Sequence, residues 1–289
     1  MKISILMENT ACSDSFCSEH GLSIYIEACG HKLLFDTGAS GAFADNAEKM
    51  GIDLAGVDTA VLSHGHYDHG GGLRRFLEIN SRAEICMNPH AFEGHYNGSG
   101  KYIGLDQELK DSGRLVFADR ACSLFDAERS AGDGAGEGLC CPGSEGTGPA
   151  CGSAVLYPSG GYELKYPVDS SGLTVERGGS FIPEDFIHEQ YLLIEENNKR
   201  VLISGCSHRG ILNIMNRFSP DVLIGGFHFM EIPAEGGGAA RLEQAARELM
   251  QYETQYFTGH CTGLAQFGLL KQIMGDRLTY ISTGMSFEI

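Results

Sequence analysis

The fold can be argued from one ten-residue stretch, Ser63-His64-Gly65-His66-Tyr67-Asp68-His69-Gly70-Gly71-Gly72, which follows a short apolar run. Three imidazoles and a carboxylate stand within six residues of one another. Imidazole nitrogens and carboxylate oxygens are common ligands of zinc and related divalent ions. Three unrelated surface histidines would be the plain alternative, but the density of ligand types argues against it. The stretch predicts a metal site at a strand end.

The spacing also predicts how the ligands are shared between two ions. Residues i and i+2 of an extended segment face the same way, so His64 and His66 can bind one ion. A turn into a following helix then swings Asp68 and His69 toward a second ion. Gly65 lets the backbone pass close beneath the ions.

Strand-length runs rich in Ile, Leu, Val and Tyr recur along the chain. They are residues 3–7, 22–27, 32–35, 59–62, 84–87, 191–195, 200–203, 221–224 and 279–282. Helical spacing is clearest in residues 242–249, with further helices expected near 72–79 and 264–273. Strands outnumber helices, which favours two sheets with outer helices.

Composition limits the partners. The chain has 289 residues and a formal net charge of 21 − 38 = −17, which disfavours nucleic acid as a partner. The N-terminal apolar run ends at Glu8, too short for a signal peptide or a membrane span, so we expect a cytoplasmic protein with reduced thiols and no membrane partner. We expect one domain over residues 1–289, and a homodimer only as a base-rate expectation.

Residues 119–169 differ from the rest because they are rich in glycine and poor in core-forming residues. We interpret them as an insertion within the domain. The stretch holds Cys122, Cys140, Cys141 and Cys151. Their spacing matches no standard zinc motif, so free thiols are favoured over a metal site.

The His-x-His-x-Asp-His pattern, preceded by Leu34-Phe35-Asp36-Thr37-Gly38, resembles the metallo-β-lactamase superfamily. Five further segments resemble its branch of 7,8-dihydropterin-6-yl-methyl-4-(β-D-ribofuranosyl)aminobenzene 5′-phosphate synthase-like proteins. They are Glu19-His20-Gly21-Leu22-Ser23, His188-Glu189-Gln190, Gly205-Cys206-Ser207-His208, Gly225-Gly226-Phe227-His228 and His260-Cys261-Thr262-Gly263. The resemblance implies an α/β fold, a four-layer αββα sandwich of two mixed β-sheets with outer helices and the metals at its rim.

The resemblance also implies the remaining ligands. His188 would complete the first metal site and His260 the second. Many relatives carry a bridging aspartate where this chain has Cys206. Three alternatives stay open: Cys206 binds as a thiolate, His208 takes the role, or water fills the position. A thiolate would favour zinc, whereas a nitrogen and oxygen shell would also accept iron or manganese.

For several polar residues near these motifs we predict supporting or catalytic roles. Asp36 is expected to orient a metal-binding histidine, and the pair Glu19 and His20 to support the first loop. His228 would contact substrate or metal, against the alternative of a structural histidine. Asp68, His208 and His228 are the catalytic candidates, and the sequence assigns no role to His31, His90 and His95.

Two divalent ions about 3.5–4 Å apart lower the pKa of a shared water to about 7 and create a hydroxide nucleophile. We therefore expect a binuclear hydrolase acting on a small phosphorylated or ester substrate. The first alternative is a transferase that joins a dihydropterin methyl group to an aminobenzene ribofuranoside phosphate with loss of diphosphate. The second is a metal or metabolite sensor without turnover.

Overall fold

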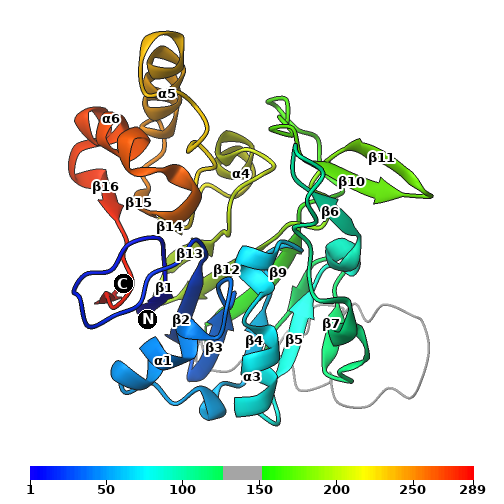
Figure 1. Ribbon diagram of the computed structural model, residues 1–289. Coiled ribbons are helices and arrows are strands. Elements are labelled where there is room, and N and C mark those ends of the chain that lie inside the picture. The colour runs from blue at the N-terminus through cyan, green and yellow to red at the C-terminus, as the bar shows by residue number, and fades with distance from the viewer. Residues whose placement is uncertain (126–151) are drawn as a thin grey trace, which may run out of the picture.

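The computed structural model describes residues 1–125 and 152–289 and contains two seven-stranded sheets packed face to face (Figure 1). The first sheet is antiparallel from β17 to β3 and parallel from β3 to β7. Its strands, in spatial order, are β17 (Ser286–Glu288), β1 (Lys2–Met7), β2 (Ser23–Ala28), β3 (His31–Phe35), β4 (Thr59–Val61), β5 (Glu84–Met87) and β7 (Leu115–Phe117).

The second sheet is parallel from β16 to β13 and antiparallel from β13 to β8. Its strands, in spatial order, are β16 (Leu278–Tyr280), β15 (Gln255–Thr258), β14 (Val222–Ile224), β13 (Lys199–Ile203), β12 (Gln190–Glu196), β9 (Ser153–Pro158) and β8 (Cys122–Ser123). A small third sheet joins β6 (Gly94–Tyr96), β10 (Thr174–Arg177) and β11 (Ser180–Pro183). The β10–β11 hairpin projects from the sandwich in Figure 1.

Three apolar clusters separate four layers. Alternate residues of each strand face opposite sides of its sheet, so Leu192 and Ile194 lie between the two sheets while Tyr191 and Leu193 face the outer helices. The first sheet packs on α1 (Ala42–Lys49) and α3 (Leu73–Ile79), and the second on α4 (Ile211–Phe218), α5 (Gly236–Leu249) and α6 (Leu264–Met274). This arrangement confirms the predicted αββα sandwich.

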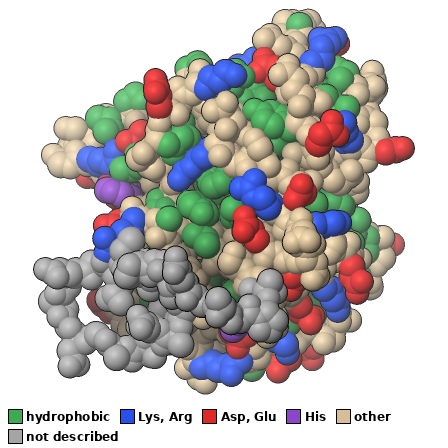
Figure 2. Space-filling model, turned by 180° about the vertical axis from the view of Figure 1, so that it is seen from behind, with side chains coloured by type: hydrophobic (Ala, Val, Ile, Leu, Met, Phe, Trp, Pro, Cys, Tyr) green, Lys and Arg blue, Asp and Glu red, His purple; other side chains and the backbone are tan. Residues whose placement is uncertain are grey.

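The remaining helical segments are short. They are α2 (Tyr67–Gly70) and the 3₁₀ turns Leu54–Gly56, Pro89–Phe92, Gln107–Asp111, His260–Thr262 and Gly275–Arg277. None of the helices in the described part of the chain is long and apolar enough to cross a bilayer. On the face shown in Figure 2, basic and acidic side chains of the described residues are interspersed.

The predicted limits of the insertion, 119–169, are too wide. Strands β8 and β9 lie inside them, and β9 is an inner strand of the second sheet, paired with both β8 and β12. Ala154 and Leu156 are fully buried between the sheets. The short strand was overlooked because glycine-rich sequence precedes it. Residues 126–151, with Cys140, Cys141 and Cys151, lie outside the described residues.

Candidate metal centre

The histidine-rich stretch runs from the end of β4 into α2. His66 has extended backbone angles (φ −98°, ψ 148°) and caps the helix, which places Asp68 and His69 on its buried turn. Gly65 passes so close to Ala91 that a Cβ at this position would lie 2.1 Å from the Ala91 carbonyl oxygen. Glycine is therefore required at position 65 because the Ala91 backbone leaves no room for a side chain.

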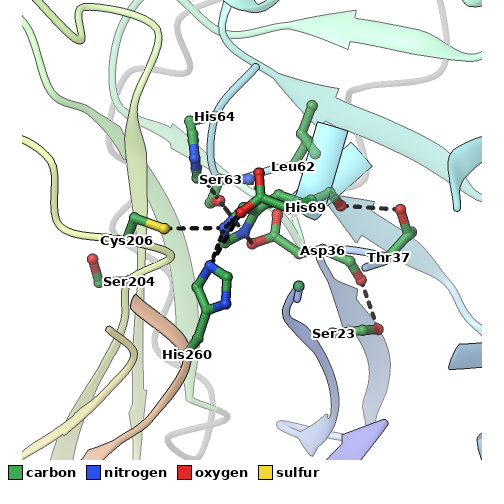
Figure 3. A network of polar contacts seen from close by, with 12 residues as sticks. Ser23, Asp36, Thr37, Leu62, Ser63, His64, His69, Ser204, Cys206 and His260 are labelled. Atoms are coloured by element: carbon green, nitrogen blue, oxygen red, sulfur yellow. Dashed lines mark hydrogen bonds and ion pairs between the residues drawn. The ribbon is translucent and has the colours of Figure 1, made fainter. Parts of the chain in front are cut away.

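Asp68, His69, Cys206 and His260 form the first group of ligand-type side chains, here called cluster A. His69 Nε2 lies 3.1 Å from Cys206 Sγ and 3.1 Å from His260 Nε2, and the three side chains converge in Figure 3. Asp68 Oδ2 lies 3.2 Å from His260 Nε2 and 3.6 Å from His69 Nε2. These separations resemble the edges of a tetrahedron around zinc, about 3.4 Å for bonds of about 2.0–2.1 Å to nitrogen.

The hydrogen bonds behind cluster A fit a cation in its centre. His69 Nδ1 donates to Asp36 Oδ2 at 2.6 Å, and His260 Nδ1 donates to Asn9 Oδ1 at 2.9 Å. In neutral imidazoles these bonds leave a lone pair on each Nε2. Two lone pairs that face each other across 3.1 Å need a proton or a metal ion between them. The donor set therefore fits a divalent ion.

Asp36 has the orienting role that the sequence predicted. Its carboxylate accepts the backbone N–H of Ser63 at 2.7 Å and the Ser63 hydroxyl at 2.7 Å, in addition to His69. Burial opposes a charge on His69, but the carboxylates of Asp36 and Asp68 outweigh it and raise the pKa of His69.

Two residues behind His260 were missed by the sequence analysis. Glu8 is fully buried and accepts the His260 backbone N–H at 2.5 Å and the Tyr280 hydroxyl at 2.9 Å. Asn9 accepts from the His260 ring. The signal was a polar pair directly after the apolar run of β1, the same strand-end placement that marked the other motifs.

His64, Cys206 and His208 form a second group, cluster B. His64 Nε2 lies 3.3 Å from His208 Nε2. Because the Ser63 hydroxyl donates to Asp36, it accepts from His64 Nδ1 at 2.8 Å, which leaves a lone pair on His64 Nε2. Cys206 is common to clusters A and B, so both Cys206 and His208 face the candidate centre. Burial raises the pKa of the free Cys206 thiol.

The loop that carries His208 is held from below by Glu189. The buried carboxylate of Glu189 accepts the backbone N–H groups of His208 at 2.7 Å and Arg209 at 3.0 Å. Phe186 stacks on the His208 ring with centroids 4.4 Å apart. These contacts fix the direction of the His208 side chain.

His66 lies in a third group, cluster C, with His95, Glu184 and His188. The sequence analysis grouped His64, His66 and His188 at one ion; here His66 and His188 gather with His95 and Glu184, and His64 gathers with Cys206 and His208. Ser63 turns His64 toward cluster B, whereas the Gly65 backbone N–H donates to His188 Nδ1 at 2.8 Å and holds that ring next to His66. The sequence analysis assigned no role to His95 and overlooked Glu184.

A cavity of about 420 Å³ opens over the clusters, lined among others by Asp68, Cys206, His208, His228 and His260. A second cavity of about 540 Å³ shares Ser171, His208, His228 and Glu231 with it. His228 belongs to none of the three clusters. Burial, with a smaller effect of His260, lowers the pKa of His228 to about 4, so a neutral imidazole lines both cavities at physiological pH.

Glu19 and His20 have different roles: Glu19 supports a loop, and His20 lines the cavity. Glu19 accepts the backbone N–H groups of Ala39 and Ser40, each at 3.0 Å, as expected for loop support. His20 lines the cavity, and its Nε2 lies 3.5 Å from Asp68 Oδ2. The sequence analysis expected only a supporting role for His20, whereas its side chain also lies at the candidate site.

The family model of the metallo-beta-lactamase superfamily matches residues 19–243. The chain belongs to the metallo-beta-lactamase superfamily. The match covers the histidine-rich stretch, His188, Cys206, His208 and His228, and ends before His260. Members of this superfamily are largely enzymes, and the fold implies the binding of divalent metal ions, which the donor sets of clusters A and B fit.

Two curated proteins are similar to this chain over most of its length. The chain is 26% identical over 278 residues to an uncharacterised protein of Methanocaldococcus jannaschii, with 94% of each chain covered. It is also 26% identical over 286 residues to the 7,8-dihydropterin-6-methyl-4-(beta-D-ribofuranosyl)-aminobenzene-5′-phosphate synthase of that organism, with 91% of this chain and 88% of the other covered.

Solved structures of metallo-beta-lactamase proteins share the fold. Tm1679, a metal-dependent hydrolase of the beta-lactamase superfamily, superposes with a TM-score of 0.76 at 26% identity, covering 100% of this chain and 99% of its own. Zinc-bound PqqB of Methylobacterium extorquens has a TM-score of 0.54 at 11% identity, with both chains covered in full. The second likeness concerns the fold alone.

Proposed function

We propose that this protein is a binuclear metal-dependent hydrolase of a small phosphoester or ester. The observation that carries the proposal is the position of Cys206, whose Sγ belongs to clusters A and B at once and lines the cavity above them. Two cations held there would supply Lewis-acid catalysis and activation of water. Zinc is the favoured metal because of the thiolate, with iron or manganese as alternatives.

The two clusters offer different numbers of ligands. Cluster A has four, Asp68, His69, Cys206 and His260, enough to close a tetrahedral shell. Cluster B has three, and two of them, Cys206 and His208, line the cavity. An ion in cluster B would lie beside the cavity, where zinc can expand its shell to take substrate or water as a further ligand. Asp68 and His208, both catalytic candidates by sequence, are assigned here as ligands.

His228 is the residue we assign to substrate contact. It lines both cavities without belonging to a cluster, and its ring centroid lies 4.2 Å from that of His208. With a pKa of about 4 it is neutral near pH 7. A neutral imidazole offers one N–H donor and one acceptor nitrogen, so His228 would bind and orient a substrate oxygen.

The cavities favour a small substrate with an anionic or ester group. Among the described residues that line the two cavities, Arg241 is the one arginine or lysine. Bound cations would provide most of the positive charge that an anionic substrate needs, whatever the net charge of the chain. We therefore infer a small phosphorylated or ester compound as the partner.

A transferase is the second candidate, because one relative is named 7,8-dihydropterin-6-methyl-4-(beta-D-ribofuranosyl)-aminobenzene-5′-phosphate synthase. That reaction would use the same ligands, with the cations neutralising the departing diphosphate. Fold and ligand set do not distinguish the two reactions.

The test is turnover by protein loaded with zinc, manganese or iron, using an aryl phosphodiester, an aryl phosphomonoester and an aryl carboxylic ester. Hydrolysis of one of them, lost in His260→Ala, is the expected result. His90→Ala, a half-exposed histidine paired with Glu93, is the matched control. Bound metal with transfer of the pterin group but no hydrolysis would favour the transferase, and bound metal without either reaction would favour a sensor.

A further inference from the structure

Cluster C consists of three histidines and a glutamate that belong to neither cluster A nor cluster B. His66 is 4% exposed, His95 and His188 are fully buried, and Glu184 is 3% exposed. The Nε2 atoms of His66, His95 and His188 have no hydrogen-bond partner among the described residues. Leaving a buried polar group without a partner is unfavourable, so the tautomers of these rings decide which of these atoms can bind a proton, a water or a metal ion.

Glu184 fixes the tautomer of His95. His95 Nδ1 lies 2.7 Å from Glu184 Oε2 and donates its proton to the carboxylate. The Nε2 of a neutral His95 is therefore an acceptor. The two ring nitrogens of an imidazole face away from each other, so an ion bound at His95 Nε2 would lie on the far side of the ring from Glu184.

Gly65 fixes the opposite tautomer in His188. The Gly65 backbone N–H donates to His188 Nδ1 at 2.8 Å, so a neutral His188 carries its proton on Nε2. That nitrogen lies 3.8 Å from Glu184 Oε1, which is too far for a hydrogen bond but close enough for the carboxylate to favour a proton on it. His188 cannot offer a lone pair at Nε2 while it keeps the bond to Gly65. These two tautomers argue against a cation in cluster C, although its donor atoms lie within 4.8 Å of one another.

His95 Nε2 and His66 Nε2 are then left facing the same buried space, one an acceptor and the other without a partner. The His66 and His95 rings meet edge to face, with centroids 5.5 Å apart and planes at 78°. Neither atom has a direct hydrogen-bond partner, so a proton on His66 Nε2 would satisfy both atoms through one bridging water. It would also leave the lone pair of His66 on Nδ1.

We propose that Glu184 and His95 are positioning residues that hold His66 as an Nδ1 ligand of the ion at cluster B. The chain of contacts runs from Glu184 through His95 to His66, and the His188 ring stacks on His95 with centroids 4.1 Å apart. The His66 ring lies 4.6 Å from His64 and 5.0 Å from His208, centroid to centroid, and lines the same cavity as His208. The inference rests on the proposed two-metal function.

Removing either positioning residue should change the affinity for only one of the two ions. Partners that fix the tautomer of a metal-binding histidine typically change metal affinity by about 10–100-fold when removed. Loss of His95 or Glu184 should weaken the ion at cluster B and leave the ion at cluster A unchanged, because Asn9 and Asp36 orient the histidines of cluster A independently.

The test compares wild type with His95→Phe, which keeps an aromatic ring beside His188, and with the milder Glu184→Gln. His31→Phe is the matched control, because His31 is half-exposed and outside all three clusters. Elemental analysis gives the ions per chain, chelator competition gives each affinity, and the absorption spectrum of cobalt-loaded protein reports ligand changes without an activity assay. Thermal unfolding checks that each variant is folded.

We expect two ions per chain at saturation in every variant. One of the two should bind about 10–100-fold more weakly in His95→Phe, and in the same direction in Glu184→Gln, with an altered cobalt spectrum. Unchanged affinities in both folded variants would overturn the positioning role while leaving the proposed function intact. Three ions in wild type, with one lost in His95→Phe, would also overturn it, because cluster C would then hold a cation. Absence of bound metal from wild type would overturn the proposed function itself.

Discussion

Asp36 accepts hydrogen bonds from His69 Nδ1 at 2.6 Å and from the Ser63 hydroxyl at 2.7 Å through the same oxygen, Oδ2. Ser63 in turn accepts from His64 Nδ1 at 2.8 Å. One aspartate at the end of β3 therefore sets the tautomer of a histidine in cluster A and of a histidine in cluster B.

Asp36→Asn should therefore weaken both ions rather than one. A carboxamide has one acceptor oxygen, so it cannot accept from the Ser63 backbone N–H as well as from the Ser63 hydroxyl and His69. We expect each affinity to fall by about 10–100-fold. Chelator competition measures the change. The control is Asp58→Asn, at a partly exposed surface ion pair with Arg82. Weakening of a single ion would contradict the shared role of Asp36.

Substitution of Cys206 and substitution of His260 should have different effects on metal binding in the chelator competition assay. Cys206 belongs to both clusters and His260 only to cluster A. Cys206→Ala should weaken both ions, whereas His260→Ala should lower the metal content toward one ion per chain. Identical metal loss in the two variants, with the folded state intact by circular dichroism, would mean that Cys206 is not shared.

Arg177 supplies a pH-dependent contribution to stability. Its guanidinium lies 2.7 Å from Asp185 and 2.7 Å from Glu93. Burial opposes ionisation of both carboxyls, but the hydrogen bonds of Arg177 outweigh it and lower the pKa of each. A lowered folded-state pKa gives stability that is present above the unfolded pKa and is lost as the pH falls through the folded value.

Arg177→Met should therefore reduce the free energy of unfolding by about 1 kcal/mol near pH 7, since the groups are partly exposed. The difference from wild type should shrink as the pH falls below about 4, where free carboxyl groups become protonated. Urea unfolding at pH 7 and pH 3.5 measures both values. A difference that stayed constant or grew in acid would contradict this account of the ion pairs.

Leu156 tests the position of β9 in the core. Its side chain is fully buried between the sheets, and Leu156→Ala should lower the free energy of unfolding by about 2–5 kcal/mol. Leu264, which is 61% exposed at the start of α6, provides a matched control. Urea titration should find Leu264→Ala close to wild type. Equal small effects in both variants would argue that residues 153–158 are not a core strand.

The sequence predicted the parts of the fold and site that depend on local patterns. Alternation in residues 191–195 and helical spacing in 242–249 were sufficient for β12 and α5, and the dense motif around His64 lies at the edge of the sandwich where the ligand-type side chains gather. Strand β9 was missed because its six residues follow glycine-rich sequence.

Residues behind the ligands could not be predicted in the same way. Asn9 reaches His260 across 251 positions of sequence, and Glu184 reaches His95 across 89. The first contact arises only when the two large sheets pack together, and the second only when β6 pairs with the β10–β11 hairpin. The division of His64 and His66 between clusters likewise depends on which ring nitrogen each neighbouring donor or acceptor occupies, and no spacing in the motif encodes that choice.

The central claim, two cations that share Cys206, is tested most directly by the number of divalent ions bound per chain at saturation, measured by elemental analysis of wild type and Cys206→Ala together with hydrolysis of the three aryl esters. The account predicts two ions per wild-type chain, both weakened in Cys206→Ala, with hydrolysis lost in parallel. One ion per chain, or two ions whose affinities do not change in Cys206→Ala, would contradict it.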